Sequence, residues 1–284
     1  MKSPLLREVT SEESKQFLRD GVVCLRNIID PQWIELTREG MEELRQAPSP
    51  YATVVDAGEL YFYVDQMPSL HNKKLRRVAF ESGTADIAKQ LIGVPQLRWL
   101  YDQLFYKGSG KVAETPWHQD TAYAPFEGMN IIRIWMPVDP VPRATTIEVV
   151  RASHLWNVVY ATAVPQVLLD NKESTTESKF SYLDKQTENL PDVPEIEAHR
   201  DSFEIIGHAV NPGDVVVFNY HILHHAGAGM NPNAKRRALA ILYADDQVSF
   251  KRRPNLVPGP VEHVGKAWQN GQRLADFPEV FPVV

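Results

Sequence analysis

The sequence is poor in the features that mark several large protein classes. Of its 284 residues only Cys24 is a cysteine, so the chain can form no internal disulfide and no cysteine-rich metal site. No apolar run approaches the ~20 residues that a membrane helix needs. Residues 1–4 lack the apolar core of a secretory signal. We therefore expect a cytoplasmic protein with no membrane partner.

The charge balance and the glycine pattern exclude two further classes. The chain has 30 basic and 36 acidic side chains, a formal charge of −6, whereas a nucleic-acid-binding protein would show a basic excess. There is no G-x-G-x-x-G or Walker loop, so a nucleotide-binding α/β fold has no support. Apolar residues make up 43% of the chain, which is enough for a sizeable core. We expect a small-molecule substrate and no nucleic-acid partner.

Helix signals occur only in the first third of the chain. Thr10 and Glu13 form a capping-box pattern, and Gly21 ends the helix that follows. Asp30 and Pro31 are typical of the N-cap and first residue of a second helix. The predicted helices run from about residue 11 to 20, from 31 to about 46, and from 83 or 84 to 92, with a strand at 22–26.

The chain becomes rich in short β segments from Leu97 onward. The strand candidates are Leu97–Tyr106, Ile131–Val138, Thr145–Val150, Ser202–His208, Asp214–Phe218, Ile222–Ala226 and Arg237–Ala244. Short strands separated by glycine and proline turns favour a sandwich or barrel over a βαβ fold.

One polar segment stands apart. Residues 170–204 carry ten acidic and four basic side chains, a net charge equal to that of the whole chain. We weigh two interpretations, a solvated surface excursion and a lid over a site, because long excursions from compact domains are often binding loops.

Two histidine-containing loci suggest a metal site. The stretch T-P-W-H-Q-D-T-A-Y at 115–123 contains His118 and Asp120, and His224 follows about a hundred residues later. Two imidazoles and one carboxylate on one face of an octahedral ion form the facial triad of non-haem Fe(II) oxygenases, which leaves three positions open. His221 and His225 compete with His224 for the third place, but strand alternation puts both on the opposite face from His224.

The order of these motifs resembles the phytanoyl-CoA dioxygenase-like family of Fe(II)/2-oxoglutarate oxygenases, nearly from end to end. The P-W-H-Q-D-T-A-Y stretch, Ser153-His154, the strand G-D-V-V-V-F at 213–218 and R-R-A-L at 236–239 occur in family order. The resemblance implies a mainly β fold with flanking helices, a cupin-like double-stranded β-helix or jelly roll. It also implies Fe(II), 2-oxoglutarate and O₂ as cofactor and co-substrates.

The resemblance further implies individual roles. His118, Asp120 and His224 match the iron ligands, and Arg236 matches the arginine that binds the distal carboxylate of 2-oxoglutarate. Its neighbour Arg237 is the alternative anchor, and the family's R-x-A-L register favours Arg236. Contacts of the co-substrate with Trp135 and Gln103 are also implied.

Arg133 is a further candidate, in this case for substrate binding. Alternation places Arg133 and Trp135 on one face of the strand at 131–138, so Arg133 reaches the site if Trp135 does. It is then a candidate to bind an anionic group of substrate or co-substrate. A structural salt bridge is the equally weighted alternative.

Three departures from the family pattern affect this interpretation. Ala226 stands where a serine often helps to hold 2-oxoglutarate, and His225 replaces a usual glycine. Arg151-Ala152 replaces the Pro-Gly that usually precedes Ser-His. By contrast, the carboxylate of Asp120 indicates a hydroxylase type, since related halogenases have a small residue there to admit chloride.

We therefore expect one domain over residues 1–284, with a helical part at 1–96 that packs on the sheet and a jelly-roll core at 97–250. The expected activity is oxidation, by hydroxylation, of an organic small molecule with release of succinate and CO₂. Natural-product tailoring by desaturation, epoxidation or ring formation is the alternative within the class. A non-catalytic jelly roll that senses a metal or ligand is the alternative from another class. The sequence indicates neither the substrate nor the oligomeric state.

Overall fold

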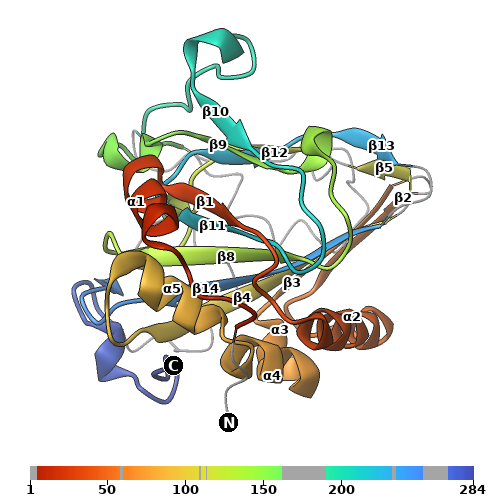
Figure 1. Ribbon diagram of the computed structural model, residues 1–284, viewed down its shortest axis with the longest axis horizontal. Helices are drawn as coiled ribbons and strands as arrows, with labels where there is room; N and C mark the ends of the chain where they lie inside the picture. The colour runs from red at the N-terminus through yellow and green to blue at the C-terminus, as the bar shows by residue number, and fades with distance from the viewer. Residues whose placement is uncertain are drawn as a thin grey trace.

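Two antiparallel sheets lie face to face, and helices cover the outer face of the larger one (Figure 1). The computed structural model describes residues 5–57, 60–108, 110–112, 114–161, 190–231, 235–251 and 268–284. Of the segment at 170–204, which could be a surface excursion or a lid, residues 170–189 lie outside the described residues. The opposed sheets have the arrangement of a jelly roll, as predicted.

Seven strands form the larger sheet, each antiparallel to its neighbours. In spatial order they are β1 (Val22–Leu25), β11 (Val215–Asn219), β8 (Ile131–Pro137), β14 (Arg236–Ala244), β4 (Arg98–Lys107), β3 (Leu60–Gln66) and β2 (Thr53–Ala57).

Four strands form the smaller sheet, in the order β10 (Ile205–Gly207), β9 (Ile147–Val150), β12 (His224–Ala226) and β6 (Thr115–His118). Two strand pairs accompany the sheets, β5 (Gly110–Val112) with β13 (Gly229–Asn231) and β7 (Phe126–Glu127) with β15 (Ser249–Phe250).

The helices are α1 (Ser11–Asp20), α2 (Pro31–Gln46), α3 (Pro68–His71), α4 (Lys73–Glu81) and α5 (Thr84–Ile92). Short 3₁₀ turns are η1 (Asp120–Ala122), η2 (Arg143–Thr145), η3 (Ser153–Leu155), η4 (Arg200–Ser202) and η5 (Leu274–Asp276). The predictions for α1, α2 and α5 are confirmed. Thr10 caps α1 in a capping box, and the Asp30 side chain accepts a hydrogen bond from Gln32 N at the start of α2. Within the described residues, no helix combines the length and apolar character required to cross a membrane.

Sequence reasoning missed α3, α4 and the hairpin of β2 and β3. The hairpin extends the larger sheet beyond β4, and β1 lies at its opposite edge. The sheet therefore takes strands from both sides of residue 96. The division into a helical part and a jelly-roll core within one domain remains a proposal.

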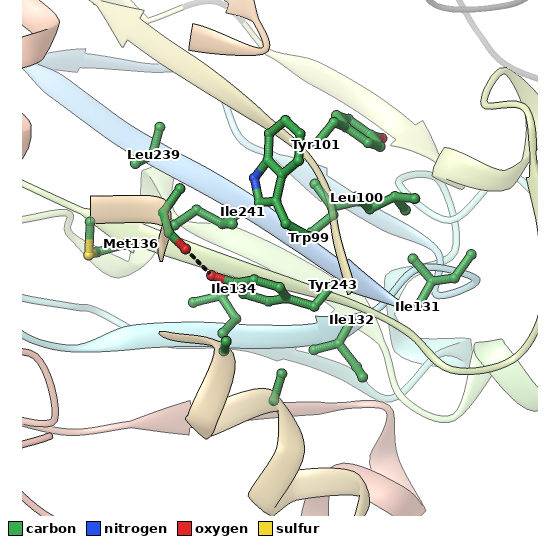
Figure 2. Close-up of a cluster of buried hydrophobic side chains, with 14 of the residues drawn as sticks. Trp99, Leu100, Tyr101, Ile131, Ile132, Ile134, Met136, Leu239, Ile241 and Tyr243 are labelled. Atoms are coloured by element: carbon green, nitrogen blue, oxygen red, sulfur yellow. Dashed lines mark hydrogen bonds between the residues drawn. The ribbon is translucent and has the colours of Figure 1, made fainter. Parts of the chain in front are cut away.

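The central strand β8 is buried on both faces, which explains its almost continuous apolar sequence. Ile132, Ile134 and Met136 pack toward the helices, together with Leu239 and Ile241 of β14 (Figure 2). Tyr243 belongs to the same cluster (Figure 2). Its hydroxyl makes a hydrogen bond of 2.7 Å with Thr84 Oγ1 of α5. The opposite face of β8 carries Arg133 and Trp135 toward the smaller sheet. Strand alternation thus separates a purely structural face from a face that can carry chemistry.

A pair of left-handed residues joins α1 to the smaller sheet. Gly21 (φ 76°) ends α1, and Ala152 (φ 57°) donates its backbone N–H to Asp20 O at 2.9 Å. A Cβ at Gly21 would overlap the ring of His154 and lie 2.9 Å from Ile222 Cδ1. Glycine is therefore required at position 21 by its backbone angle and by the close contact.

We predict that Gly21→Ala lowers the free energy of unfolding by about 2–4 kcal/mol, from the cost of a left-handed alanine plus overpacking against His154. Chemical denaturation measures the effect. Ala152→Gly is the matched control, because it relieves a left-handed alanine at the same junction and should cost nothing. Equal stability of Gly21→Ala and the wild type would contradict this account.

Candidate metal centre

Two histidines from neighbouring strands of the smaller sheet stand side by side. His118 of β6 is the direct partner of His224 of β12, so both side chains leave the same face of the sheet. Their ring centroids are 4.2 Å apart. Pairing of β6 with β12 therefore brings together two residues that lie about a hundred positions apart in the sequence.

Each imidazole is oriented by a backbone carbonyl. His118 Nδ1 lies 2.7 Å from Pro116 O, and His224 Nδ1 lies 3.0 Å from Ile222 O. Because a carbonyl can only accept, both Nδ1 atoms carry the proton and both Nε2 atoms keep a lone pair. This is the tautomer that a metal requires at Nε2.

The carboxylate of Asp120 faces both lone pairs. Its Oδ1 lies 3.7 Å from His118 Nε2 and 3.9 Å from His224 Nε2. The Tyr123 hydroxyl donates to Oδ1, and Arg133 Nη1 donates to Oδ2. Since Arg133 extends from β8, the centre lies between the two sheets.

The protonation states suit a metal site. Burial alone would raise the pKa of Asp120, but the charge of Arg133 and the nearby histidines outweigh it and lower the pKa to about 2. Burial and the electrostatic effect of His118 lower the pKa of His224 to about 3. Burial also lowers the pKa of His118. At neutral pH the site therefore presents two neutral imidazoles and one carboxylate.

These residues fit the facial triad predicted from the sequence. The donor atoms of His118, Asp120 and His224 all lie within 4.8 Å of one another. Two neutral nitrogen donors and one anionic oxygen on one side of an ion match the ligand set of non-haem Fe(II).

The two competing histidines point elsewhere. The ring of His221 contacts Thr121 Oγ1 at 3.0 Å and Gly128 O at 2.7 Å. His225 stacks on Trp117, with centroids 4.1 Å apart, and its Nε2 lies 2.6 Å from Glu148 Oε2.

His225, Glu148 and Glu197 also form a group that could hold a metal. However, Glu148 is already paired with Arg143 and with Arg200, the latter at 2.9 Å. Burial would raise the pKa of Glu148, but hydrogen bonds from His225 and these two arginines lower it to about 2. Protein cations therefore occupy this carboxylate.

A buried guanidinium without a carboxylate partner lies on the inner face of the larger sheet. Arg236 is 8% exposed, its Nε has no hydrogen-bond partner, and no described carboxylate lies within ion-pair distance. Its Cζ lies 5.5 Å from the ring of Trp135. Burial lowers its pKa to about 10, so the charge persists at neutral pH.

Arg237 occupies the other face of β14. It makes a two-pronged ion pair with Asp139, at 2.8 and 2.9 Å, and donates to Glu42 of α2 at 3.0 Å. Its hydrogen-bonding groups are used in surface pairing, so Arg236 is the arginine that remains available on the inner face.

Gln103 lies in register with Trp135 across the small side chain of Ala240. Its Nε2 donates to Gln66 Oε1 at 2.9 Å, while its Oε1 has no partner in the described structure. The structure therefore brings Gln103, Trp135 and Arg236 to one face of one sheet.

Three polar residues near the centre were not anticipated. Tyr123 donates to Asp120, and Lys107 is the direct cross-strand partner of Arg236. Lys107 Nζ donates to Thr115 Oγ1 at 3.3 Å, and Thr115 is in turn the strand partner of Ala226. The hydroxyl that position 226 lacks is thus available from the adjacent strand. The only sequence feature that could have indicated Lys107 is its position at the end of a strand rich in aromatic residues.

Trp117 and Gln119, which flank His118 in the sequence, anchor other segments. Gln119 donates to Val158 O at 3.1 Å and to His221 O at 2.7 Å, and accepts from Tyr160 N at 3.0 Å. Trp117 Nε1 donates to Glu197 Oε1 at 2.7 Å. In this short segment, His118 and Asp120 face the candidate metal centre, whereas Trp117 and Gln119 bind the neighbouring chain segments.

Comparison with known proteins identifies a family and a fold. The family model described as phytanoyl-CoA dioxygenase (PhyH) matches residues 17–238. No match was found among curated proteins.

Three solved structures illustrate the fold similarity. The non-haem α-ketoglutarate-dependent carbocyclase SnoK from nogalamycin biosynthesis is 18% identical, with a TM-score of 0.71 and 99% of each chain covered. The epimerase SnoN, in complex with Fe³⁺, α-ketoglutarate and nogalamycin RO, is 17% identical, with a TM-score of 0.69 and coverage of 96% of this chain and 97% of SnoN. EctD from S. alaskensis, with 2-oxoglutarate and 5-hydroxyectoine, is 15% identical, with a TM-score of 0.65 and coverage of 95% and 88%. All three share the jelly-roll arrangement.

We predict that His118→Ala, Asp120→Ala and His224→Ala each weaken Fe(II) binding by more than the roughly 10–100-fold caused by changes outside a ligand set. A facial triad has no spare ligand, so each loss should be severe. Anaerobic titration calorimetry measures the affinity. His225→Ala is the matched control next to His224 and should keep the metal. Loss of iron in His225→Ala with retention in His224→Ala would reverse the assignment.

Proposed function

The chain belongs to the phytanoyl-CoA dioxygenase family of 2-oxoglutarate-dependent non-haem iron oxygenases, and on that basis we propose that it hydroxylates an organic small molecule. In this reaction 2-oxoglutarate and O₂ are consumed, and succinate and CO₂ are released. His118, Asp120 and His224 would hold the iron.

One observation carries the proposal. The three converging donor atoms and the unpaired guanidinium of Arg236 both belong to the space between the two sheets. A buried cation without an anionic partner is costly, and a bound dicarboxylate would compensate it. The other end of the dicarboxylate would then be free to reach the metal held by His118, Asp120 and His224.

The residues of this chain would bind and orient the co-substrate. Arg236 would pair with the distal carboxylate through its planar fork, and the ring of Trp135 keeps that fork in place. The open acceptor of Gln103 would receive a hydrogen bond from a water that bridges it to the co-substrate, because 2-oxoglutarate itself has no donor. Iron, when bound, supplies the oxygen chemistry that breaks a substrate C–H bond.

A tailoring reaction is the second candidate. SnoK, which matches over 99% of both chains, is named a carbocyclase, and SnoN an epimerase. Ring formation, epoxidation and desaturation use the same kind of ligand set, so a tailoring substrate would be accepted at the same centre. The third candidate is a metal-binding sensor without turnover.

We predict that the protein forms succinate from 2-oxoglutarate only with added Fe(II) and O₂, and that this rate rises when the right substrate is present. A metabolite screen for succinate, followed by mass spectrometry of the consumed compound, makes the measurement. A product mass increase of one oxygen supports hydroxylation, and a loss of two hydrogens supports desaturation or ring closure. Asp120→Ala is the inactive control. Absence of succinate from an iron-loaded protein across the screen would favour the sensor.

We predict that Arg236→Gln weakens 2-oxoglutarate binding by about tenfold to a hundredfold, the equivalent of the roughly 1.5–3 kcal/mol in a charge-assisted pair, and leaves Fe(II) affinity nearly unchanged. Anaerobic titration of the iron-loaded protein measures both. Arg237→Gln is the matched control on the other face of β14 and should alter stability instead. A larger loss of 2-oxoglutarate binding in Arg237→Gln would refute the assignment.

A further inference from the structure

The guanidinium of Arg133 is buried beside the metal ligands and only partly satisfied. It is 4% exposed, and its Nη1 donates to Asp120 Oδ2. Its Nη2 is also buried but has no hydrogen-bond partner among the described residues. One donor of this buried cation is therefore left for a group that the chain does not supply.

The geometry around Arg133 fixes the direction of that donor. The Cζ atom lies 5.7 Å from the ring of Phe105 on β4 and 5.9 Å from the ring of Phe218 on β11. Because Asp120 holds Nη1 and two aromatic rings lie close to Cζ, the guanidinium is held in place before any ligand binds. A preorganised donor loses little entropy when an acceptor arrives.

Another buried arginine of the same sheet shows the contrast. Arg98 of β4 is 7% exposed, and it donates from Nε to Asp246 at 2.6 Å and from Nη1 to Phe281 O at 2.9 Å. No nitrogen of Arg98 is buried without a partner. Arg98 is thus satisfied by the protein alone, whereas Arg133 is not.

The charge balance between the sheets identifies the missing group. Arg133 and Arg236 are two buried cations, and Asp120 is the only carboxylate that the described structure places against either of them. The buried Lys107 opposite Arg236 is not counted as a cation, because burial and the charge of Arg236 lower its pKa well below the usual range. A divalent metal adds two positive charges, and the dianion 2-oxoglutarate compensates two. One positive charge then remains, so the centre favours a ligand with one further carboxylate.

We propose that Arg133 forms a carboxylate-binding subsite next to the metal ligands, in which Nη1 donates to Asp120 and Nη2 donates to a carboxylate oxygen of a bound ligand. The charge balance favours an acidic substrate as the source of this oxygen, and the 1-carboxylate of the co-substrate, which that balance already counts, is the alternative that the test distinguishes. The inference rests on the proposed function, because it assumes that a ligand binds beside the iron ligands. A carboxylate at this point would orient an acidic substrate relative to the metal.

The test uses the full chain loaded with Co(II), whose visible absorption reports ligands near the metal without turnover. With saturating 2-oxoglutarate, benzoate, phenylacetate and hexanoate are titrated against their primary amides. For a substrate subsite, at least one acid binds the wild type at least tenfold more tightly than its amide. In Arg133→Gln this preference disappears, while 2-oxoglutarate binding changes less than threefold.

The other arm identifies the co-substrate. If Arg133→Gln weakens 2-oxoglutarate tenfold or more and the wild type shows no preference for the acids, the 1-carboxylate is the occupant. Arg98→Gln is the matched control for loss of a buried guanidinium from the same sheet and should change neither binding. Unchanged binding of both ligand types in Arg133→Gln would overturn the subsite and leave Arg133 as a structural partner of Asp120.

A second variant guards against loss of the metal. Arg133→Lys keeps a positive charge for Asp120 but replaces the fork by a single ammonium group. This variant should still bind Co(II), but it should lose either the preference for acids over amides or the affinity for 2-oxoglutarate. If the variant keeps that preference and that affinity, the subsite is again overturned. Because these titrations need no turnover, a negative succinate screen would refute the proposed reaction without altering their outcome.

Discussion

The ion pair between Asp120, in the turn η1 that follows β6, and Arg133 of β8 joins the two layers at the candidate metal centre. A carboxylate without solvent exposure is stable only if its charge is compensated, and here the compensating cation comes from the opposite sheet. The pair keeps Asp120 ionised and directs its second oxygen toward the two imidazoles. Formation of the centre thus depends on correct packing of the two layers, since neither sheet contains both partners.

Strand alternation distributes the remaining roles. On β14 it sends Arg236 inward and Arg237 toward α2, and around β12 it sends His224 and His225 to different partners. Adjacent residues of the same type therefore differ completely in environment. A shift of one residue in β14 would replace Arg236 on the inner face by Arg237. A shift of one residue in β12 would replace the imidazole that faces Asp120 by the one that stacks on Trp117.

The sequence allowed the fold class and the three converging residues to be predicted, because ligand types, their order and the period of a strand are local properties. Other features depend on partners distant in sequence. Lys107 is opposite Arg236 only because β4 pairs with β14. Tyr123 is close to Asp120 in sequence, but its contact with the carboxylate depends on the turn η1, which the sequence did not indicate. Helix α4 and the β2–β3 hairpin were missed for a related reason. α4 has only three buried apolar residues, and the hairpin extends a sheet whose next strand begins more than thirty residues later.

The anchoring of Val158, Tyr160 and Glu197 by Gln119 and Trp117 has an evolutionary consequence. These contacts fix the chain on both sides of residues 162–189 to the segment that carries His118 and Asp120. Insertions, deletions or exchanges between the anchors can therefore accumulate without displacing the ligands. The candidate centre can thus be inherited unchanged while the connecting chain varies in length and composition.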